Sequence, residues 1–248
     1  MFINKIYQHI EYHIASRNSK AFFNSKTDHM KHYEDNIVKI QNNVGLNNYT
    51  GLEIPLTKPI DLNIDFANLM SKRKSERDFQ NYEINLKELS TILYYTCGYK
   101  LAGDGKKHTP SSGGFNSVEI FPIVLSSNEI NAGIYYFDSK KNCLNEIYIN
   151  NFKEWLVNDV FYQKEWVNAS VVFILTSNIG RLTSKYLLRS YRLGLLDVGH
   201  VSQNFYLTAT AMDLKVCASG GYIESEIENA IDINGIDVAS FLTIMIGK

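Results

Sequence analysis

Three stretches of the chain carry side chains whose types and spacing suit work on a bound ligand. The first is the cationic run SKRKSERDF, in which Arg73 and Arg77 lie four residues apart and would face the same way on a helix. Two guanidinium groups in that arrangement can grip a phosphate through forked, charge-assisted hydrogen bonds. The alternative is a solvated run of surface charge.

A second stretch, Pro110 to Gly114, combines hydroxyl groups with glycines. Ser111 and Ser112 offer their hydroxyls, and Gly113 and Gly114 leave backbone N–H groups open to an anion or a polar ring. The chain has no Walker-type phosphate loop, and its one Gly-Asp-Gly step lacks the strand and helix of a dinucleotide fingerprint. This stretch therefore predicts a loop along the edge of a ligand.

The third stretch holds Lys185 and Tyr186 at the start of a long periodic segment, Thr183 to Leu214. Apolar residues recur there at three- and four-residue steps, which predicts one continuous helix of roughly 45 Å. Thr183 and Ser184 are candidate N-caps. Its polar row is most simply a solvated face: Arg189, Asp197, His200 and Asn204.

Two glycines inside this segment, Gly194 and Gly199, weaken a helix unless another backbone or a ligand approaches closely. The segment is then either an ordinary buried core helix or a helix that packs on its twin in a homodimer. Neither interpretation explains why Lys185 and Tyr186 stand together at its start.

The elements around these stretches alternate between strands and helices, which indicates an α+β fold. A short helix is expected over 65–73, and Asn85 and Gly98 should cap a helix over 86–97. A hairpin with its turn at 138–142 and a helix over 152–161 are expected, and a Gly-Gly step should open a helix after residue 219. Further strands are expected over 118–125, 169–178 and 241–247.

Composition narrows the class of protein. The chain has 248 residues, 45% of them hydrophobic, and a formal net charge of -1, so nucleic acid is not an expected partner. No apolar run is long enough for a membrane span and no signal peptide is evident, so we expect a cytoplasmic protein. The three cysteines lack zinc-site spacing, and the histidine pairs His9/His13 and His29/His32 lack a third ligand, so no metal site is expected.

Residues 1–62 are expected to form a helical extension and a linker, and 63–248 the main domain. Amphipathic helices are predicted over 3–14 and 30–40, and the segment 42–61 is predicted to be an extended linker because it is rich in glycine and proline. The extension would pack on the main domain or dock onto another protein, and the sequence leaves both open.

Taken in order, four pieces resemble the nitroreductase-type flavoproteins, and within them the SagB/McbC-type FMN-dependent dehydrogenases. The RKSERDF run, 73–79, is similar to the family's RRSxRxF, and PSSGG, 110–114, is similar to PSAGA. The pieces KYLLRSYR and GHVSQN resemble KYxxRxYR and GHxxQN, and Gly221-Tyr222 resembles the family's GF/GY step. The chain departs at Asn116-Ser117, where the family usually has Tyr-Pro, and at Lys107, where it often has Arg.

The resemblance implies a nitroreductase-like fold with a central mixed or antiparallel sheet, flanked by helices, and a long helix at a homodimer interface that binds FMN. It implies that Arg73 and Arg77 hold the phosphate or ribityl end of FMN. The residues that would edge the flavin are Ser75, Ser111, Ser112 and Gly113, with Asn204 as a further candidate. The backbone at Gly220 and Gly221 would lie near the redox-active ring nitrogen.

The resemblance also implies an activity, the oxidation of peptide thiazolines or oxazolines to thiazoles or oxazoles. The expected partners are an azoline-bearing precursor peptide and the cyclodehydratase or scaffold proteins of a peptide-modifying complex. Tyr186 would be the base and Lys185 the cation that favours its phenolate, although the reverse stays open. Alternatives are a flavin-dependent NAD(P)H reductase of a dehydroamino acid, nitro or quinone compound, and a non-catalytic scaffold subunit.

Overall fold

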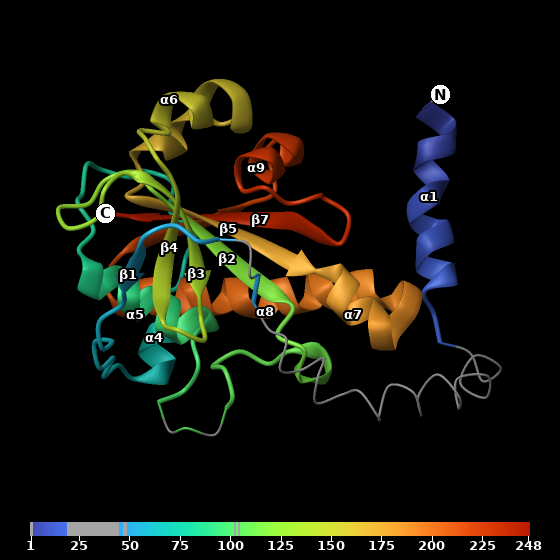
Figure 1. Cartoon of the computed structure of the whole chain (residues 1–248), viewed down its shortest axis with the longest axis horizontal. Coiled ribbons are helices and arrows are strands. Elements are labelled where there is room, and N and C mark those ends of the chain that lie inside the picture. The colour runs from blue at the N-terminus through green and yellow to red at the C-terminus, as the bar shows by residue number, and fades with distance from the viewer. Residues whose placement is uncertain (1, 19–44, 47–48, 102, 104) are drawn as a thin grey trace.

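One antiparallel sheet forms the centre of the molecule (Figure 1). The computed structural model describes residues 2–18, 45–46, 49–101, 103 and 105–248. The sheet has seven strands in the order β1-β4-β3-β2-β5-β7-β6, and each neighbouring pair is antiparallel. The strands are β1 (Glu53–Pro55), β2 (Val118–Val124), β3 (Gly133–Asp138), β4 (Cys143–Ile149), β5 (Val171–Asn178), β6 (Lys215–Ser219) and β7 (Val238–Gly247).

Helices cover both faces of this sheet, which confirms the expected α+β class. Figure 1 shows α4, α5 and α8 on one face and α6 and α9 on the other. The helices are α1 (Phe2–Ala15), α4 (Phe66–Lys72), α5 (Leu86–Cys97), α6 (Lys153–Trp155), α7 (Ile179–Tyr186), α8 (Ser190–Ala211) and α9 (Glu224–Ala230). Shorter turns are the 3-10 turns 112–114, 164–168 and 187–189 and the π-helical turn 156–160.

The alternation of side chains along β5 explains why two hydrophobic layers form. Phe173 and Leu175 belong to the layer that contains α5 and α8, whereas Val172 and Ile174 belong to the layer that contains Ile227 of α9. Successive strand residues point to opposite faces, so the apolar run at the start of β5 can serve both layers.

The capping residues predicted for α5 are found at its two ends. The side chain of Asn85 accepts a hydrogen bond from the Glu88 backbone at 2.8 Å, and Glu88 accepts one from the Asn85 backbone at 3.1 Å. This reciprocal capping box starts the helix, and Gly98 ends it. The predicted hairpin is also confirmed, because Asp138 accepts backbone hydrogen bonds from Lys140 and Lys141 inside its turn.

The segment 42–61 is not wholly a linker. Its residues Glu53–Pro55 form β1, an edge strand that pairs with β4. Three residues between glycine and proline are too short a run to show a strand period, so the sequence alone indicated only a linker. The domain boundary at residue 62 remains a prediction.

The long helix predicted from Thr183 to Leu214 is wrong as one continuous element. It breaks at Leu187, whose φ of 51° and ψ of -133° end α7, and α8 starts three residues later. The break lets Leu182 of α7 and Leu193 of α8 pack around Phe115 in a small separate core. Thr183 and Ser184 are therefore inside α7, and Asn178 is its N-cap.

The stripe predicted to be buried along this segment is buried only in part. Phe205 and Ala209 are in the core, but Leu188 and Leu195 are 66% and 43% exposed. Gly194 does permit a close approach, because a Cβ there would lie 2.6 Å from Ile179 and 2.8 Å from Ser177. A Cβ at Gly199 would meet nothing within 4 Å in this chain.

The predicted N-terminal helix is confirmed as α1, which packs against the start of α8 beyond the end of α7 (Figure 1). The Tyr12 hydroxyl donates to the Leu188 carbonyl at 3.3 Å and accepts from the Arg192 backbone at 3.0 Å. The Arg192 guanidinium also donates to the Ser16 hydroxyl at 2.6 Å. The second predicted helix, over 30–40, lies outside the described residues.

The described residues hold no cluster of three or more metal-ligating side chains, and none of the described helices has the length and apolar character of a bilayer crossing. Cys97, Cys143 and Cys217 are all free and buried.

A buried ion pair fixes α7 to the sheet. Arg181 of α7 lies 3.1 Å from Glu119 of β2, and the two side chains are only 6% and 2% exposed. The Tyr136 hydroxyl donates to the other Glu119 oxygen at 3.1 Å, and the Arg181 guanidinium donates to the Asn116 carbonyl at 2.7 Å. Because Asn116 belongs to the loop before β2, this pair also positions that loop.

Replacement of Arg181 by Met should strongly destabilise the protein. It would leave Glu119 buried without its cation, which typically costs about 3–5 kcal/mol. Urea unfolding of Arg181→Met and wild type measures the difference in the free energy of unfolding.

Lys74→Ala provides the matched control, because Lys74 pairs with Glu76 at 3.0 Å while being 68% exposed. Loss of an exposed pair should cost about 0–1 kcal/mol. Equal, small losses in the two variants would show that the buried pair does not fix α7.

Candidate functional site

One buried carboxylate holds the loop Ser111 to Ser117. Asp197 of α8 is 2% exposed and accepts a hydrogen bond from the Ser112 backbone at 3.0 Å. It also accepts from three hydroxyls, those of Ser112 at 2.8 Å, Ser117 at 3.1 Å and Ser111 at 3.2 Å. The hydroxyl protons of Ser111 and Ser112 are thus directed to Asp197, and a ligand at this loop would meet the backbone around Gly113.

The sequence did not reveal that Asp197 is buried and holds the loop, because Asp197 belongs to a polar row that was interpreted as a solvated helix face. Its position three residues after Gly194 and four before Val201, both buried, was the available signal. A carboxylate on the buried side of a helix needs several donors, and the serine-rich loop supplies them.

The structure brings Tyr186 and the Ser111–Gly114 loop together. Gly113 has a φ of +61°, and a Cβ added there would collide with the Tyr186 hydroxyl oxygen. The Tyr186 ring also meets the Phe115 ring edge-on at 6.0 Å between centroids. The Lys185 ammonium lies 5.3 Å from the centre of the Tyr186 ring. Two of the three stretches singled out by the sequence therefore form one cluster.

The expected effect of Lys185 on Tyr186 is opposed by two features of the structure. Burial, together with the Asp197 carboxylate, raises the pKa of Tyr186 above its ordinary value. Both causes disfavour the charged form, so Tyr186 is a neutral phenol at neutral pH. Such a group can donate a proton or a hydrogen bond.

The arginine run forms a second cluster further along α8. The Arg73 guanidinium lies 5.4 Å from the centre of the Tyr206 ring, and the Ser75 hydroxyl is 3.0 Å from the Tyr206 hydroxyl. The Tyr206 hydroxyl also accepts from the Ala218 backbone of β6 at 2.9 Å. Nine residues separate Tyr206 from Asp197, which is about 13 Å along a helix.

Arg73 and Arg77 do not share a helical face, contrary to expectation. Helix α4 ends at Lys72, and the chain after Arg73 runs beside β6, where the Glu76 backbone donates to the Val216 carbonyl at 2.9 Å. Among the ion pairs formed by the described residues, none includes Arg73 or Arg77. A guanidinium group without a carboxylate partner among the described residues, such as that of Arg73, is a donor that suits a phosphate.

The remaining predicted residues lie in two places. Gly220 and Gly221 form an exposed turn after β6, and a Cβ at Gly220 would meet nothing within 4 Å. Helix α9 starts at Glu224, so the Gly-Gly step precedes the helix instead of opening it. The Asn204 side chain donates to the Tyr95 carbonyl at 2.9 Å and so ties α8 to α5.

These positions fit an FMN molecule by the chemistry of their groups. Guanidinium groups suit the phosphate, and the open backbone at Gly220 leaves room for a planar ring. The two clusters lie about 13 Å apart along α8.

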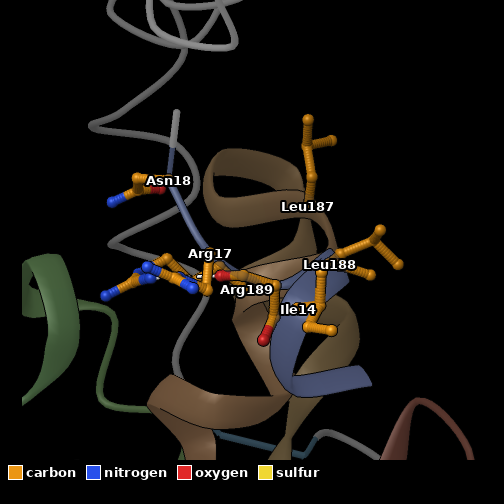
Figure 2. A pocket seen from close by; sticks show the side chains of 8 residues that line it. Ile14, Arg17, Asn18, Leu187, Leu188 and Arg189 are labelled. Atoms are coloured by element: carbon orange, nitrogen blue, oxygen red, sulfur yellow. Dashed lines mark hydrogen bonds between the residues drawn. The ribbon is translucent and has the colours of Figure 1, made fainter. Parts of the chain in front are cut away.

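A cavity of about 620 Å³ lies where α1 meets the α7–α8 break (Figure 2). In Figure 2, Arg17 and Arg189 extend to one side of it, and Leu187 and Leu188 form another side. Arg189 donates to the Ser16 carbonyl at 3.1 Å, which holds the end of α1 in place. The cavity begins one residue after Tyr186, but Tyr186 does not line it.

Comparison with known proteins shows the family to which this chain is related. The nitroreductase family profile matches residues 70–248. A Methanocaldococcus jannaschii protein, provisionally assigned as a nitroreductase, is 29% identical over 171 residues, which cover 68% of this chain and 85% of that protein. An Anabaena variabilis structure, also provisionally assigned as a nitroreductase, is 26% identical with a TM-score of 0.68. The match covers 80% of this chain but only 42% of that one.

Two more distant structures share the fold. A chain of the Escherichia coli microcin synthetase McbBCD complex, with truncated pro-MccB17 bound, is 17% identical with a TM-score of 0.62. It matches 94% of this chain and 98% of its own length. An Exiguobacterium sibiricum protein, provisionally assigned as a nitroreductase and crystallised with FMN, is 17% identical with a TM-score of 0.52 over 75% of this chain and 89% of its own. The family profile spans most of the chain, and the chain therefore belongs to the nitroreductase family.

Proposed function

We propose that this protein is an FMN-dependent dehydrogenase that oxidises azoline rings in a ribosomally made peptide to azoles. The observation that carries the proposal is the contact between Tyr186, next to Lys185, and the Ser111–Gly114 loop, because two motifs of the azoline dehydrogenases meet there. The match to the McbBCD chain along nearly its whole length supports this choice within the family.

The reaction removes a proton from one ring carbon of the azoline and a hydride from its neighbour. When bound, FMN supplies the acceptor for the hydride. Arg73 and Arg77 would hold its phosphate, and the turn at Gly220 and Gly221 would lie along the ring. The Gly113 backbone would orient the ring from the side of Tyr186.

Lys185 and Tyr186 are the residues that we expect to handle the proton from the azoline ring carbon. We assign the proton transfer to the pair of Lys185 and Tyr186. Lys185 can take the proton only as an uncharged amine, and Tyr186 only as its phenolate, which its raised pKa disfavours. A positioned base contributes typically about 10² to 10⁴-fold to the rate.

We further propose that a second copy of the chain completes the site. The two clusters lie about 13 Å apart along α8. Leu188 in the turn before α8 and Leu195 and Leu196 of α8 are 66%, 43% and 55% exposed. A helix face with this much apolar surface suits a homodimer interface. Cyclodehydratase or scaffold proteins of a peptide-modifying complex are the proposed further partners.

The neutral phenol of Tyr186 also favours a second candidate, a flavin-dependent reductase. In that direction the substrate receives a hydride, and a neutral Tyr186 is the appropriate proton donor. The acceptor would be a dehydroamino acid, a nitro compound or a quinone, and NAD(P)H would supply the electrons.

Absorbance spectroscopy and peptide mass spectrometry separate the two candidates. The dehydrogenase should show a flavin spectrum and remove two hydrogens per ring from a synthetic azoline peptide in air. Bound flavin that NAD(P)H bleaches rapidly, with no mass change in the peptide, would instead establish the reductase. A colourless protein that takes up no FMN would contradict both.

Lys185→Ala and Tyr186→Phe should keep FMN bound but slow azoline oxidation. We expect a loss of about 10² to 10⁴-fold in either variant, because each removes one member of the pair that handles the proton. FMN fluorescence quenching measures binding, and mass spectrometry measures turnover; unchanged turnover in both variants would refute the assignment.

Gly113→Ala should impair turnover because its methyl group would displace the Tyr186 hydroxyl. Gly105→Ala is the matched control, since Gly105 has a similar φ of +68° and a Cβ there meets nothing within 4 Å. Both variants carry the strain of a left-handed backbone, about 1–2 kcal/mol. Only Gly113→Ala should slow oxidation, and an equal effect of the two would mean that the Tyr186 contact is irrelevant.

A further inference from the structure

We propose that Asp197 is a positioning residue of this site, which sets where the Ser111–Gly113 backbone stands relative to the Tyr186 hydroxyl. Its carboxylate accepts from the Ser112 backbone at 3.0 Å and from the Ser112 hydroxyl at 2.8 Å. Gly113 follows directly, and its Cα is the point of the loop that abuts Tyr186. The carboxylate is thus one residue away from the contact that it controls.

The number of hydrogen-bond donors around this side chain explains why position 197 holds an aspartate and not an asparagine. Asp197 accepts from three hydroxyls and one backbone N–H, divided between its two oxygens. A carboxylate is acceptor-only at both oxygens, whereas an Asn side chain offers one oxygen and would place an NH₂ group against the other donors. No ion pair among the described residues includes Asp197, so these hydrogen bonds compensate its buried charge.

The far end of the loop has a second anchor in addition to the hydrogen bond from Ser117 to Asp197. The Arg181 guanidinium donates to the Asn116 carbonyl at 2.7 Å, and Asn116 in turn donates from its backbone to the Ser111 hydroxyl at 2.8 Å. The loop is therefore held at both ends, and Asp197 controls the end that meets Tyr186. Loss of its charge should release that end while Arg181 keeps the other end in place.

A second consequence concerns the proton on Tyr186. The charged groups recorded beside Tyr186 are Asp197 on α8 and Lys185 on its own helix, and Phe115 covers part of its ring. The Asp197 carboxylate adds to burial in raising the pKa of the phenol. The catalytic meaning of this arrangement rests on the proposed function, but the arrangement itself can be tested without any substrate.

The test uses the full-length protein with ¹³C-labelled tyrosine, whose ring carbon signal reports ionisation. Comparison with Tyr186→Phe assigns the Tyr186 signal, and a titration from pH 7 to 11 follows it in wild type, Asp197→Asn and Ser117→Ala. Hydrogen exchange of the Gly114 amide, which donates to the Ser111 carbonyl at 3.1 Å, reports how well the loop is held.

In Asp197→Asn we expect Tyr186 to ionise at lower pH and the Gly114 amide to exchange about tenfold faster, as the loss of charged hydrogen bonds implies. Ser117→Ala removes one donor to Asp197 and leaves the charge, so Tyr186 should ionise as in wild type. A merely structural role of Asp197 would speed exchange without moving the ionisation of Tyr186.

An Asp197→Asn protein in which neither signal changes would overturn the proposal, as would a Ser117→Ala protein that lowers the ionisation of Tyr186 equally. If Asp197→Asn does not fold, Ser112→Ala takes its place, because it removes one hydrogen bond to Asp197 and keeps the charge. Faster exchange of the Gly114 amide with unchanged ionisation of Tyr186 would support the proposal. Unchanged exchange would overturn it. Absence of azoline oxidation would count against the proposed function alone, because none of these signals depends on substrate.

Discussion

The arrangement of this site depends on a buried carboxylate that forms no ion pair with the described residues. Neighbouring groups must therefore donate hydrogen bonds to it. Asp197 is 2% exposed, and a charge so placed is tolerated only when several donors surround it. The donors come from one serine-rich loop, so this loop must lie where its hydroxyls reach the Asp197 carboxylate. That constraint brings Gly113 against Tyr186 and joins two sequence motifs that are about seventy residues apart.

The same helix links the constraint to the second cluster. Asp197 acts near the first third of α8, and Tyr206, further along, holds Arg73 and Ser75 beside β6. The buried Arg181–Glu119 pair fixes α7 so that the chain can turn sharply at Leu187 into α8. Charge burial at two points thus fixes α7 and the loop before β2.

Local features of the fold were predictable from the sequence. The capping box at Asn85, the apolar run of β5 and the hairpin turn at Asp138 are each specified by a few neighbouring residues. The family resemblance, carried by short motifs in order, gave the overall architecture.

The rest depended on contacts between distant residues. The break at Leu187 follows from packing of Leu182 and Leu193 around Phe115, which no helical period reveals. Asp197 looked solvated because its polar row was read without the loop that covers it. The surroundings of Tyr186 were hidden for the same reason: Lys185 is its neighbour in sequence, but burial and Asp197 raise its pKa.

Titration of the flavin-free protein with FMN, followed through assigned backbone amide signals, tests the central claim most directly. If α8 carries the flavin site, the signals of Gly113, Ser75 and Gly221 should shift and saturate together at one FMN per chain, while those of α6 on the opposite face stay unchanged. Failure to bind FMN, or shifts that leave Gly113 and Gly221 unaffected, would contradict the account.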